Sequence, residues 1–451
     1  MKQPNIIFLF SDQQRWDTCG CYGQALDTTP NLDRMAKEGV CFENTFTCQP
    51  VCGPARAAIQ TGRYPAEVGC HTNHRLLPLD RKTIAHHLSE HGYDTAYIGK
   101  WHLASCGERN GIDDFRTRPV PAERRGGYDY WLAADALEFT SHGYDGHMFD
   151  GEGNKRVFPE GRYRADAQTD WVIEYLRDRG DKQPFFLFVS YIEPHHQNDH
   201  GHYEGPAGSK ELFRDFVPPG DLVEGQGDWQ SEYPDYLGCI NSLDRNVGRI
   251  LDALKELGLE ENTLLTYTSD HGSHFRTRNG EYKRSCHDGC IHVPLIMRGP
   301  GFKGGLRPDQ MTSLIDIPPT ILAAGGVERG GNLTPYSFMK GRPLQDVVEG
   351  KTSDWPEEVF LQISESHCGR AIRTRKWKYS VRAPGKSGQD PSSEVYVEDF
   401  LYDLDKDPHE QNNLVNDPGT APVRKELCAV LKRRMVEGGE KEPRITRENN
   451  E

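Results

Sequence analysis

Buried strands are the clearest pattern in this chain, and each is followed by polar side chains. Apolar runs begin at Asn5, Tyr93, Gln183 and Thr263. They are short and rich in aromatic and β-branched residues, which is typical of strands in a buried sheet. The runs end in Ser11-Asp12-Gln13, Gly99-Lys100-Trp101-His102, Pro194-His195-His196 and Asp270-His271-Gly272. Because open α/β sheets bind ligands at the carboxyl ends of their strands, we expect a site there.

Segments with the periodicity of helices lie between and after these apolar runs. The clearest helix is predicted over residues 236–257, where Leu, Ile and Val recur three to four positions apart. A hydroxyl cap followed by Pro begins a short helix at Thr29-Pro30. Further helices are expected over residues 55–60 and 82–90, and another one after Asp316.

The length of the chain and a change in its predicted elements indicate two domains. The chain has 451 residues, more than one domain usually contains. We expect a first domain at 1–335, a loop-rich connector at 330–355 and a smaller α+β subdomain at 356–440. A charged tail follows at 441–451, and the chain is expected to be mobile from Glu437 to its end. Strands of the second part are expected over 359–363, 370–374, 377–381 and 400–404, and its helix over 421–435. The sequence contains no internal repeat.

Because the chain is acidic overall, any anionic ligand must be held by a local group of positive charges. The chain has 54 Lys and Arg against 68 Asp and Glu, a net charge of −14, which argues against binding to nucleic acid or anionic membranes. The first apolar run is too short for a signal-peptide core, and no segment reaches membrane-spanning length, so we expect a soluble, cytoplasmic protein. The 12 cysteines are then expected to be reduced, with Cys19, Cys21, Cys286 and Cys290 as structural thiols.

The stretch with the most specific chemistry is centred on Cys52. Cys52-Gly-Pro54-Ala-Arg56 spells C-x-P-x-R, and Thr61-Gly62-Arg63 follows. Taken alone, this pentapeptide also fits an ordinary turn around a buried thiol. The helix expected next would place Cys52 at a helix N-terminus, where backbone N–H groups favour an anionic oxygen. The pattern closely resembles the signature of the type I sulfatases.

Further matches follow in the order of that family. The four strand endings match its metal and histidine motifs, and Lys283 begins a stretch similar to K-x-[ST]-x-Y-E-G-G-I-R-V-P, in which His287 and His292 replace Tyr and Arg. Residues 402–414 match its C-terminal element, so the resemblance runs from Asn5 to Leu414. The chain is identified as a member of the type I, formylglycine-dependent sulfatases of the alkaline phosphatase superfamily, similar to arylsulfatases and carbohydrate sulfatases.

The resemblance implies a fold and a set of site residues. The fold would be α/β, with a large, mixed, mostly parallel sheet sandwiched by helices and a smaller C-terminal α+β subdomain carrying an antiparallel sheet. The catalytic residues implied are Cys52, Arg56, Lys100, His102, His195 and Lys283. The implied ligands of a divalent cation, Ca²⁺ first and Mn²⁺ or Mg²⁺ as alternatives, are Asp12, Gln13, Cys52, Asp270 and His271. Gln13 stands where the family usually has a second Asp, although an amide oxygen also ligates Ca²⁺.

The family also implies roles for these residues. Cys52 would be oxidised to formylglycine (3-oxoalanine), and one hydroxyl of its hydrated aldehyde would attack sulfur. Lys100, Lys283 and the cation would spread the charge on the sulfuryl oxygens. His195 would protonate the leaving oxygen, and His102 would take the proton of the second hydroxyl as sulfate departs.

The predicted activity is hydrolysis of a sulfate monoester of a small carbohydrate. The polar loops 197–208 and 274–282 favour hydroxyl-rich leaving groups. An aryl sulfate is an alternative, as is a phosphonate or phosphate diester, because Asp12-Gln13 with Asp270-His271 is also the metal pattern of those hydrolases. A non-catalytic binding protein is a further alternative. The implied partners are a small anionic sulfated substrate and a formylglycine-generating maturation enzyme, while self-association stays open.

Three smaller features keep more than one interpretation. His200 and His202 are either loop residues or a separate metal cluster. Arg276 and Arg278 either hold an acidic group of the substrate or are solvated. His196 belongs either to the structure of the loop or to the rim of the substrate site.

Overall fold

A large twisted sheet forms the centre of the molecule. The computed structural model describes residues 3–108, 110–180, 184–223, 226–328 and 335–447. Nine strands lie in the order β2-β10-β9-β1-β8-β4-β5-β6-β7. Their bounds are β1 (Asn5–Ser11), β2 (Val40–Cys41), β4 (Asp94–Lys100), β5 (Tyr130–Ala134), β6 (His147–Asp150), β7 (Lys155–Val157), β8 (Phe185–Ser190), β9 (Thr263–Ser269) and β10 (Leu295–Arg298). The pairs from β9 to β5 are parallel and the outer pairs antiparallel, which confirms a mixed, mostly parallel sheet.

Alternation along the strands places one apolar cluster on each face. Ile6, Phe8 and Phe10 of β1 belong to one cluster, whereas Ile7 and Leu9 belong to the other. Successive side chains of a strand point to opposite faces, so each apolar run of the sequence serves two cores. All seven residues of β1 are buried, as expected for a strand covered on both faces.

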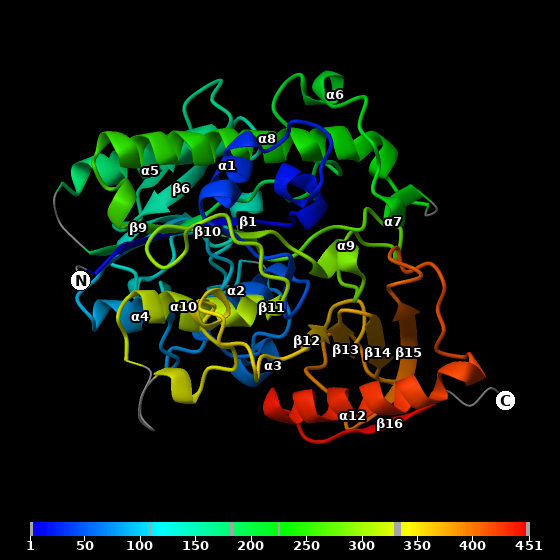
Figure 1. Cartoon of the computed structure of the whole chain (residues 1–451). Helices are drawn as coiled ribbons and strands as arrows, with labels where there is room; N and C mark the ends of the chain where they lie inside the picture. The colour runs from blue at the N-terminus through cyan, green and yellow to red at the C-terminus, as the bar shows by residue number, and fades with distance from the viewer. Residues whose placement is uncertain (1–2, 109, 181–183, 224–225, 329–334, 448–451) are drawn as a thin grey trace.

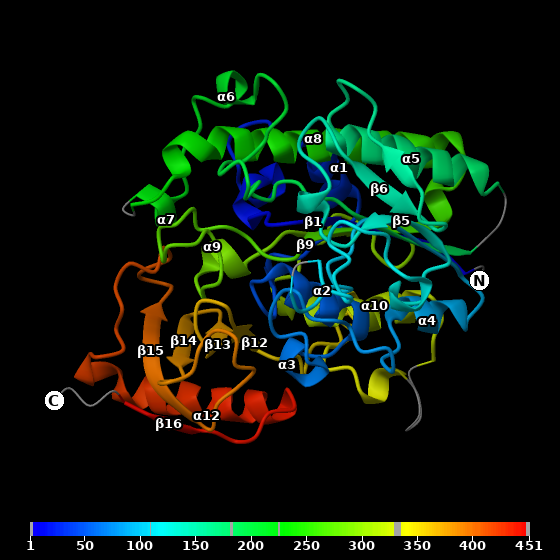
Figure 2. The same ribbon diagram turned by 180° about the vertical axis from the view of Figure 1, so that it is seen from behind.

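Helices cover both faces of this sheet, as Figures 1 and 2 show. One layer consists of α1 (Pro30–Glu38), α5 (Arg164–Asp178) and α8 (Trp229–Glu256), and the other of α2 (Cys52–Thr61), α4 (Ile84–Ser89) and α10 (Ile317–Ala324). The predicted helices are therefore present. The start expected for α8 at residue 236 was wrong, because α8 begins at Trp229 and contains Pro234. Burial of Tyr233 and Tyr236 against Phe275 offsets the hydrogen bond that Pro234 cannot donate.

Four elements between residues 104 and 182 were not predicted. They are β5, β6, β7 and α5. β5 is short, and β7 lies at the sheet edge with partly exposed side chains, so neither has a long apolar run. The strand expected from Gln183 begins at Phe185; Gln183 itself lies outside the described residues. Short elements complete this part: β3 (Asn44–Phe46), β11 (Met311–Ser313), α3 (Pro65–Val68), α6 (Ser209–Leu212), α7 (Gly220–Val223), α9 (Asp288–Ile291) and α11 (Gln345–Val348).

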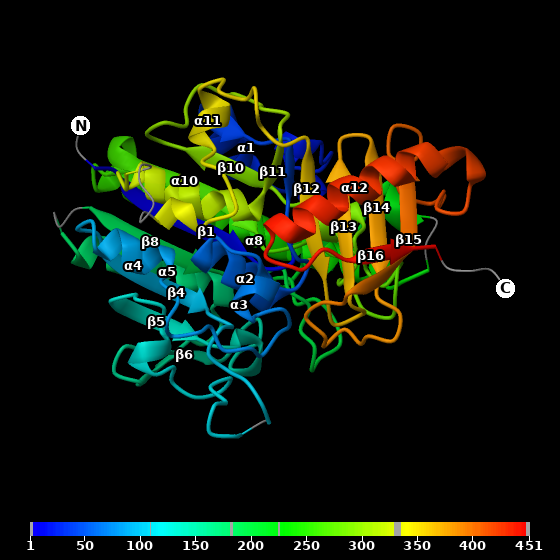
Figure 3. The same ribbon diagram turned by 90° about the horizontal axis from the view of Figure 1, so that it is seen from below.

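A second sheet lies in the C-terminal part, with α12 (Ala421–Glu437) across it (Figure 3). It contains β12 (Glu358–Ile363), β13 (Gly369–Thr374), β14 (Trp377–Arg382) and β15 (Val395–Asp403), all antiparallel, and β16 (Arg444–Thr446), parallel to β15. The four predicted strands are confirmed, although β15 begins at Val395 instead of Phe400. Within the tail that the sequence predicts to be mobile from Glu437 on, residues 444–446 form β16 and pair with β15, whereas residues 448–451 lie outside the described residues. In the part of the chain that is described, no helix has the length and apolar character needed to cross a membrane.

The two sheets are joined by an apolar cluster and a buried ionic group. Ile291 of α9 and Met311 of β11 pack with Val359, Leu361 and Ala371 of the second sheet. Asp288 of α9 accepts hydrogen bonds from Arg373 Nη2 at 2.9 Å and from Lys378 Nζ at 2.5 Å. Burial alone would raise the pKa of Asp288, but Arg373 and Lys378 hold it far below its usual value. The ionised carboxylate thus ties the segment after Lys283 to the C-terminal sheet.

We expect Asp288→Asn to destabilise the protein by about 3–5 kcal/mol, because it leaves the buried Arg373 without an anion, whereas Lys378 keeps its pairing with Glu410. Asp309→Asn is the matched control, since Asp309 pairs with Arg375 at 2.6 Å with more than half of both side chains exposed; its cost should stay below about 1 kcal/mol. Urea unfolding of both variants measures the difference. Equal losses would show that the buried group contributes no more than a surface pair.

Candidate active site

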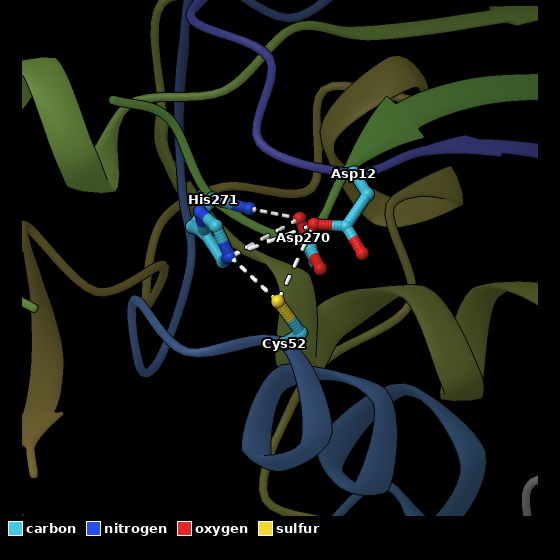
Figure 4. A group of neighbouring side chains, drawn as sticks. All are labelled: Asp12, Cys52, Asp270 and His271. Carbon is cyan, nitrogen blue, oxygen red and sulfur yellow. Dashed lines mark hydrogen bonds and ion pairs between the residues drawn. The ribbon is translucent and has the colours of Figure 1, made fainter. Parts of the chain in front are cut away.

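The strand endings meet at one edge of the large sheet. Asp12 follows β1 and Asp270 follows the adjacent β9, so both carboxylates lie side by side with His271 and Cys52 (Figure 4). The Cys52 Sγ atom lies 3.3 Å from Asp12 Oδ1 and 3.2 Å from His271 Nε2. His271 Nε2 is 3.8 Å from Asp12 Oδ1 and 3.7 Å from Asp270 Oδ1. All four side chains are fully buried.

Helix α2 places Cys52 and Arg56 at this edge. The helix begins at Cys52, which confirms the predicted position at its N-terminus. Arg56, one turn later, donates to Asp12 Oδ2 at 2.9 Å and lies 3.9 Å from Asp270 Oδ2. Its other terminal nitrogen donates to the Lys100 carbonyl at 2.8 Å and to Ser190 Oγ at 2.7 Å. Arg56 is therefore fixed between both acidic residues and the ends of β4 and β8.

Two lysines bring further positive charge to Cys52. Lys283 Nζ donates to Cys52 Sγ at 2.9 Å and lies 3.3 Å from His195 Nε2. Lys100 Nζ lies 2.9 Å from Asp12 Oδ2 and 3.1 Å from Glu138 Oε2. Burial lowers the pKa of Lys100, but Asp12 and then Glu138 raise it more, so the net shift is upward. Both lysines carry a positive charge at neutral pH.

The Cys52 thiol itself is neutral. Burial, followed by the charge of Asp12, raises the pKa of Cys52 to about 12 despite Lys283 and Lys100. A thiolate is the reactive form of cysteine, so unmodified Cys52 is a weak nucleophile at neutral pH. Asp12 keeps its charge, because Lys100, Arg56 and Lys283 together outweigh its burial and hold its pKa well below the usual value.

His102 and His195 are neutral imidazoles. Burial and then Lys100 lower the pKa of each well below the usual value. Neither ring nitrogen of His102 has a hydrogen-bond partner among the described residues, and the same is true of Nδ1 of His195. Both rings therefore have nitrogens available to a ligand.

Gln13 offers an unpaired oxygen beside the acidic pair. Its backbone N–H donates to Asp270 Oδ1 at 2.9 Å, and its Nε2 donates to the Tyr203 hydroxyl at 2.5 Å. Its Oε1 is buried without a hydrogen-bond partner in the described structure. Oxygens of Asp12, Gln13 and Asp270 with a nitrogen of His271 suit a hard divalent cation, and a cation would satisfy this orphaned acceptor. The residues therefore fit the predicted cation site.

The structure brings together every predicted site residue. Asp12, Cys52, Arg56, Lys100, His195, Asp270, His271 and Lys283 form one connected group, while Gln13 joins it through Asp270, and His102 follows Lys100 at the end of β4. The proximity of Asp12 and Lys100 to His102 also contributes to the pKa of that histidine. The catalytic and ligand roles of these residues stay predictions.

Sequence reasoning missed three residues that support this group. Ser190 at the end of β8 accepts from Arg56, and Glu138 pairs with Lys100. The backbone carbonyl of Asp135 accepts from His102 N at 2.6 Å, and its carboxylate accepts from the N–H groups of Leu103 and Ala104. Asp135 and Glu138 follow β5, so an acidic residue after a strand would have indicated them, had β5 been predicted.

The structure shows the contacts of several residues whose roles the sequence leaves open. Arg278 donates to the carbonyls of Glu410 and His409 at 2.7 and 2.5 Å, and Arg276 pairs with Asp228 at 3.2 Å, so both have partners within the chain. His287 hydrogen-bonds the Tyr402 hydroxyl at 3.1 Å, and the His292 ring stacks on Trp16. His196 stacks on Tyr282 at 4.9 Å, beside the group that surrounds Cys52.

Comparison with known proteins shows that the chain belongs to the sulfatase family. The sulfatase family model matches residues 4–327, and the model described as N-sulphoglucosamine sulphohydrolase, C-terminal, matches residues 280–437. The chain is therefore a sulfuric ester hydrolase, and its α/β fold is that of the alkaline phosphatase superfamily.

Its relatives include sulfatases named for polysaccharide and sugar substrates. The chain is 29% identical to an ulvan-active sulfatase of Formosa agariphila, over 97% of this chain and 82% of the relative. It is 27% identical to an N-acetylglucosamine-6-O-sulfatase of Bacteroides thetaiotaomicron, over 98% and 88%. The crystal structure of the sulfatase candidate YidJ from Bacteroides fragilis superposes with a TM-score of 0.83 at 25% identity, covering 97% of this chain and 96% of that one.

Cation binding to this site should weaken in acid. Burial, followed by the charge of Asp12, raises the pKa of Asp270 to about 7. Below that pH a proton occupies the carboxylate, so a cation must displace it, and the affinity should fall about tenfold per pH unit. Calorimetric titration of chelator-treated protein with Ca²⁺ on both sides of neutrality measures this, with Asp270→Asn as the control that removes the dependence. A dissociation constant that does not change with pH would contradict a role for Asp270 as a ligand.

Proposed function

We propose that this sulfatase uses a formylglycine made from Cys52 and a divalent cation, Ca²⁺ first, to hydrolyse the sulfate monoester of a small carbohydrate. One observation carries the proposal. Cys52 lies at a helix N-terminus within hydrogen-bond distance of Lys283, Asp12 and His271, in a group that also contains Arg56 and Lys100. Such a set of cations around one side chain suits an anionic oxygen and a sulfuryl group.

The state of the thiol supports modification of Cys52. With a pKa of about 12, the thiol is protonated and does not supply a strong nucleophile. In the modified protein, the Sγ position is taken by the aldehyde oxygen, or by the two hydroxyls of its hydrate. These oxygens would meet Lys283 and His271, which are the contacts Sγ makes here. A bound cation would supply the charge that favours an ionised hydroxyl at this position.

The sulfuryl group would be bound by Lys100 and Lys283. Both side chains are buried, and Lys283 Nζ lies 3.3 Å from His195 Nε2. In the ligand-free protein His195 is neutral because of burial and the charge of Lys100. A bound sulfate ester adds negative charge next to both lysines, so substrate binding raises the pKa of His195 and suits it to protonate the leaving oxygen as the S–O bond breaks.

His102 is assigned to the second half of the reaction. Its neutral ring has two unpartnered nitrogens, so it can take the proton of the remaining hydroxyl. The C–O bond to sulfate then breaks, sulfate leaves, and the aldehyde forms again. No water needs to attack sulfur in this sequence, because the nucleophile's own carbon releases the product.

Modification of Cys52 requires the unfolded chain. Cys52 has no exposed surface, and all residues of α2 are buried. A maturation enzyme must contact its target side chain, so we place its action before folding. The protein then folds around the finished aldehyde.

The substrates for which two relatives are named support a carbohydrate substrate. Ulvan and N-acetylglucosamine are named for two proteins that match this chain over nearly its whole length. The polar loops 197–208 and 274–282 support the same class. Tyr282 and Asn198 connect these loops by a hydrogen bond of 2.8 Å beside His196, so both contribute to one rim.

Protein co-expressed with a maturation enzyme should release sulfate from a sulfated sugar in preference to an aryl sulfate or an aryl phosphonate. Cys52→Ala, which cannot form the aldehyde, should lower kcat/KM at least about 10⁴-fold. Ion chromatography of released sulfate or phosphonate across such a panel measures both. Substantial activity of Cys52→Ala would end the formylglycine proposal, and preference for the phosphonate would overturn the substrate class alone.

His102→Ala should keep the first displacement and lose the second. A sulfated enzyme then accumulates, and kcat falls about 10²–10⁴-fold as expected for loss of a general base. Mass spectrometry of acid-quenched protein would detect one added SO₃ group on the peptide that contains Cys52. The double variant with Cys52→Ala is the blank. If His102→Ala is slow but carries no added group, His102 acts before or during the attack on sulfur.

A further inference from the structure

A histidine-rich turn follows the pair His195-His196. Backbone N–H groups of Gln197 and Gly201 donate to the carbonyls of His202 and Gln197, both at 2.9 Å, and these bonds close the turn. Gly201 has a φ of 74°, which favours glycine at this position. The turn presents the side chains of Asp199, His200 and His202, and Glu204 follows.

Two groups of metal-ligand side chains meet at this turn. His200, His202 and Glu204 offer ligand atoms within 4.8 Å of one another, and so do His142, Asp199 and His200. His142 belongs to a different loop, before α5, and its ring stacks on His200 at 4.2 Å and 8°. The two groups share His200, so five potential ligands form a single patch. No residue of this patch belongs to the group around Cys52.

Hydrogen bonds already hold several of these side chains in place. His202 Nδ1 bonds to the Tyr203 carbonyl at 2.9 Å, which leaves Nε2 as the nitrogen available to a metal. Glu204 Oε2 accepts from Gly143 N at 2.8 Å, and Asp199 Oδ1 accepts from Gln197 Nε2 at 2.7 Å. Metal ligands in proteins are commonly oriented by such outer partners. Hydrogen bonds thus orient potential ligand side chains in this turn.

Charge and donor type select the kind of cation. Asp145, Asp199 and Glu204 place three carboxylates around three imidazoles, and His142 bonds to both aspartates at 3.0 and 2.9 Å. The negative charge favours a cation. Imidazole nitrogens with one or two carboxylates suit Zn²⁺ and similar transition metals, whereas Ca²⁺ takes oxygen ligands.

We propose that this patch holds a second metal site, in which His200, His202 and Glu204 bind Zn²⁺ or a similar transition-metal cation beside His142 and Asp199. The turn is also connected to the group around Cys52. Gln197 Nε2 donates to the carbonyl of Glu138 at 3.0 Å, and the carboxylate of Glu138 pairs with Lys100. Bound metal would therefore fix the loop that connects His195 with the rim of the substrate site.

Zinc stoichiometry tests the site without an activity assay. The full chain is treated with chelator and then dialysed against Zn²⁺. Plasma mass spectrometry should then find one more zinc ion per protein in the wild type than in His200→Ala or His202→Ala. Asp270→Asn should keep this metal, because it alters only the other site. His91→Ala, an exposed histidine outside the patch, is the matched control. Loss of one ligand should raise the dissociation constant of the site about 100-fold or more.

Equal zinc content and equal dissociation constants in the wild type, His200→Ala and His202→Ala would overturn the proposal. Dialysis against Ca²⁺ should give the same uptake in all of these proteins, and a loss of Ca²⁺ in His202→Ala would overturn the choice of metal class. His200 is exposed and His202 partly exposed, so the variants should fold, which circular dichroism checks. The result is independent of whether the proposed sulfatase chemistry at Cys52 holds.

Discussion

The buried carboxylate of Asp12 is the interaction on which the site depends. One of its oxygens accepts a hydrogen bond from Arg56 at 2.9 Å and forms an ion pair with Lys100 at 2.9 Å, and the other lies 3.3 Å from Cys52 Sγ. A carboxylate without exposed surface costs several kcal/mol unless it is paired, so these two cations stabilise the fold around Asp12. Asp12 has this place because β1 lies between β8 and β9 in the parallel part of the sheet. The central strand therefore determines where these charged side chains converge.

The charges around Asp12 would also couple the binding of a cation to the binding of an anion. Without ligands, the positive charges of Arg56, Lys100 and Lys283 are balanced by those of Asp12, Asp270 and Glu138. A divalent cation bound to the two aspartates would leave the basic side chains in excess. An anionic sulfuryl group compensates that excess, so each ligand makes the other more favourable. A chain with a net charge of −14 can thus hold an anion in one small, basic place.

The sequence predicts the parts of the fold that have strong local patterns. β1, β8 and β9 are nearly continuous apolar runs because both of their faces are covered, and the polar residues after them indicated the site. β6 and β7 at the sheet edge lack such a run, so they were missed. The motif around Cys52 identified most of the site through its resemblance to a family. Contacts such as Gln13 with Tyr203 join residues far apart in the chain, and no local pattern contains them.

Backbone conformation explains how the site presents its side chains. Gln13 and His102 adopt φ values of 74° and 62°, in a region that costs a residue with a side chain about 1–3 kcal/mol. Each is held there by its surroundings: Tyr236 donates to the Gln13 carbonyl at 2.6 Å, and Asp135 binds the N–H groups of His102 and the two residues after it. Glycine would adopt these angles with less strain but would supply neither an amide oxygen nor an imidazole. At both positions the strained backbone therefore carries a side chain of the predicted site.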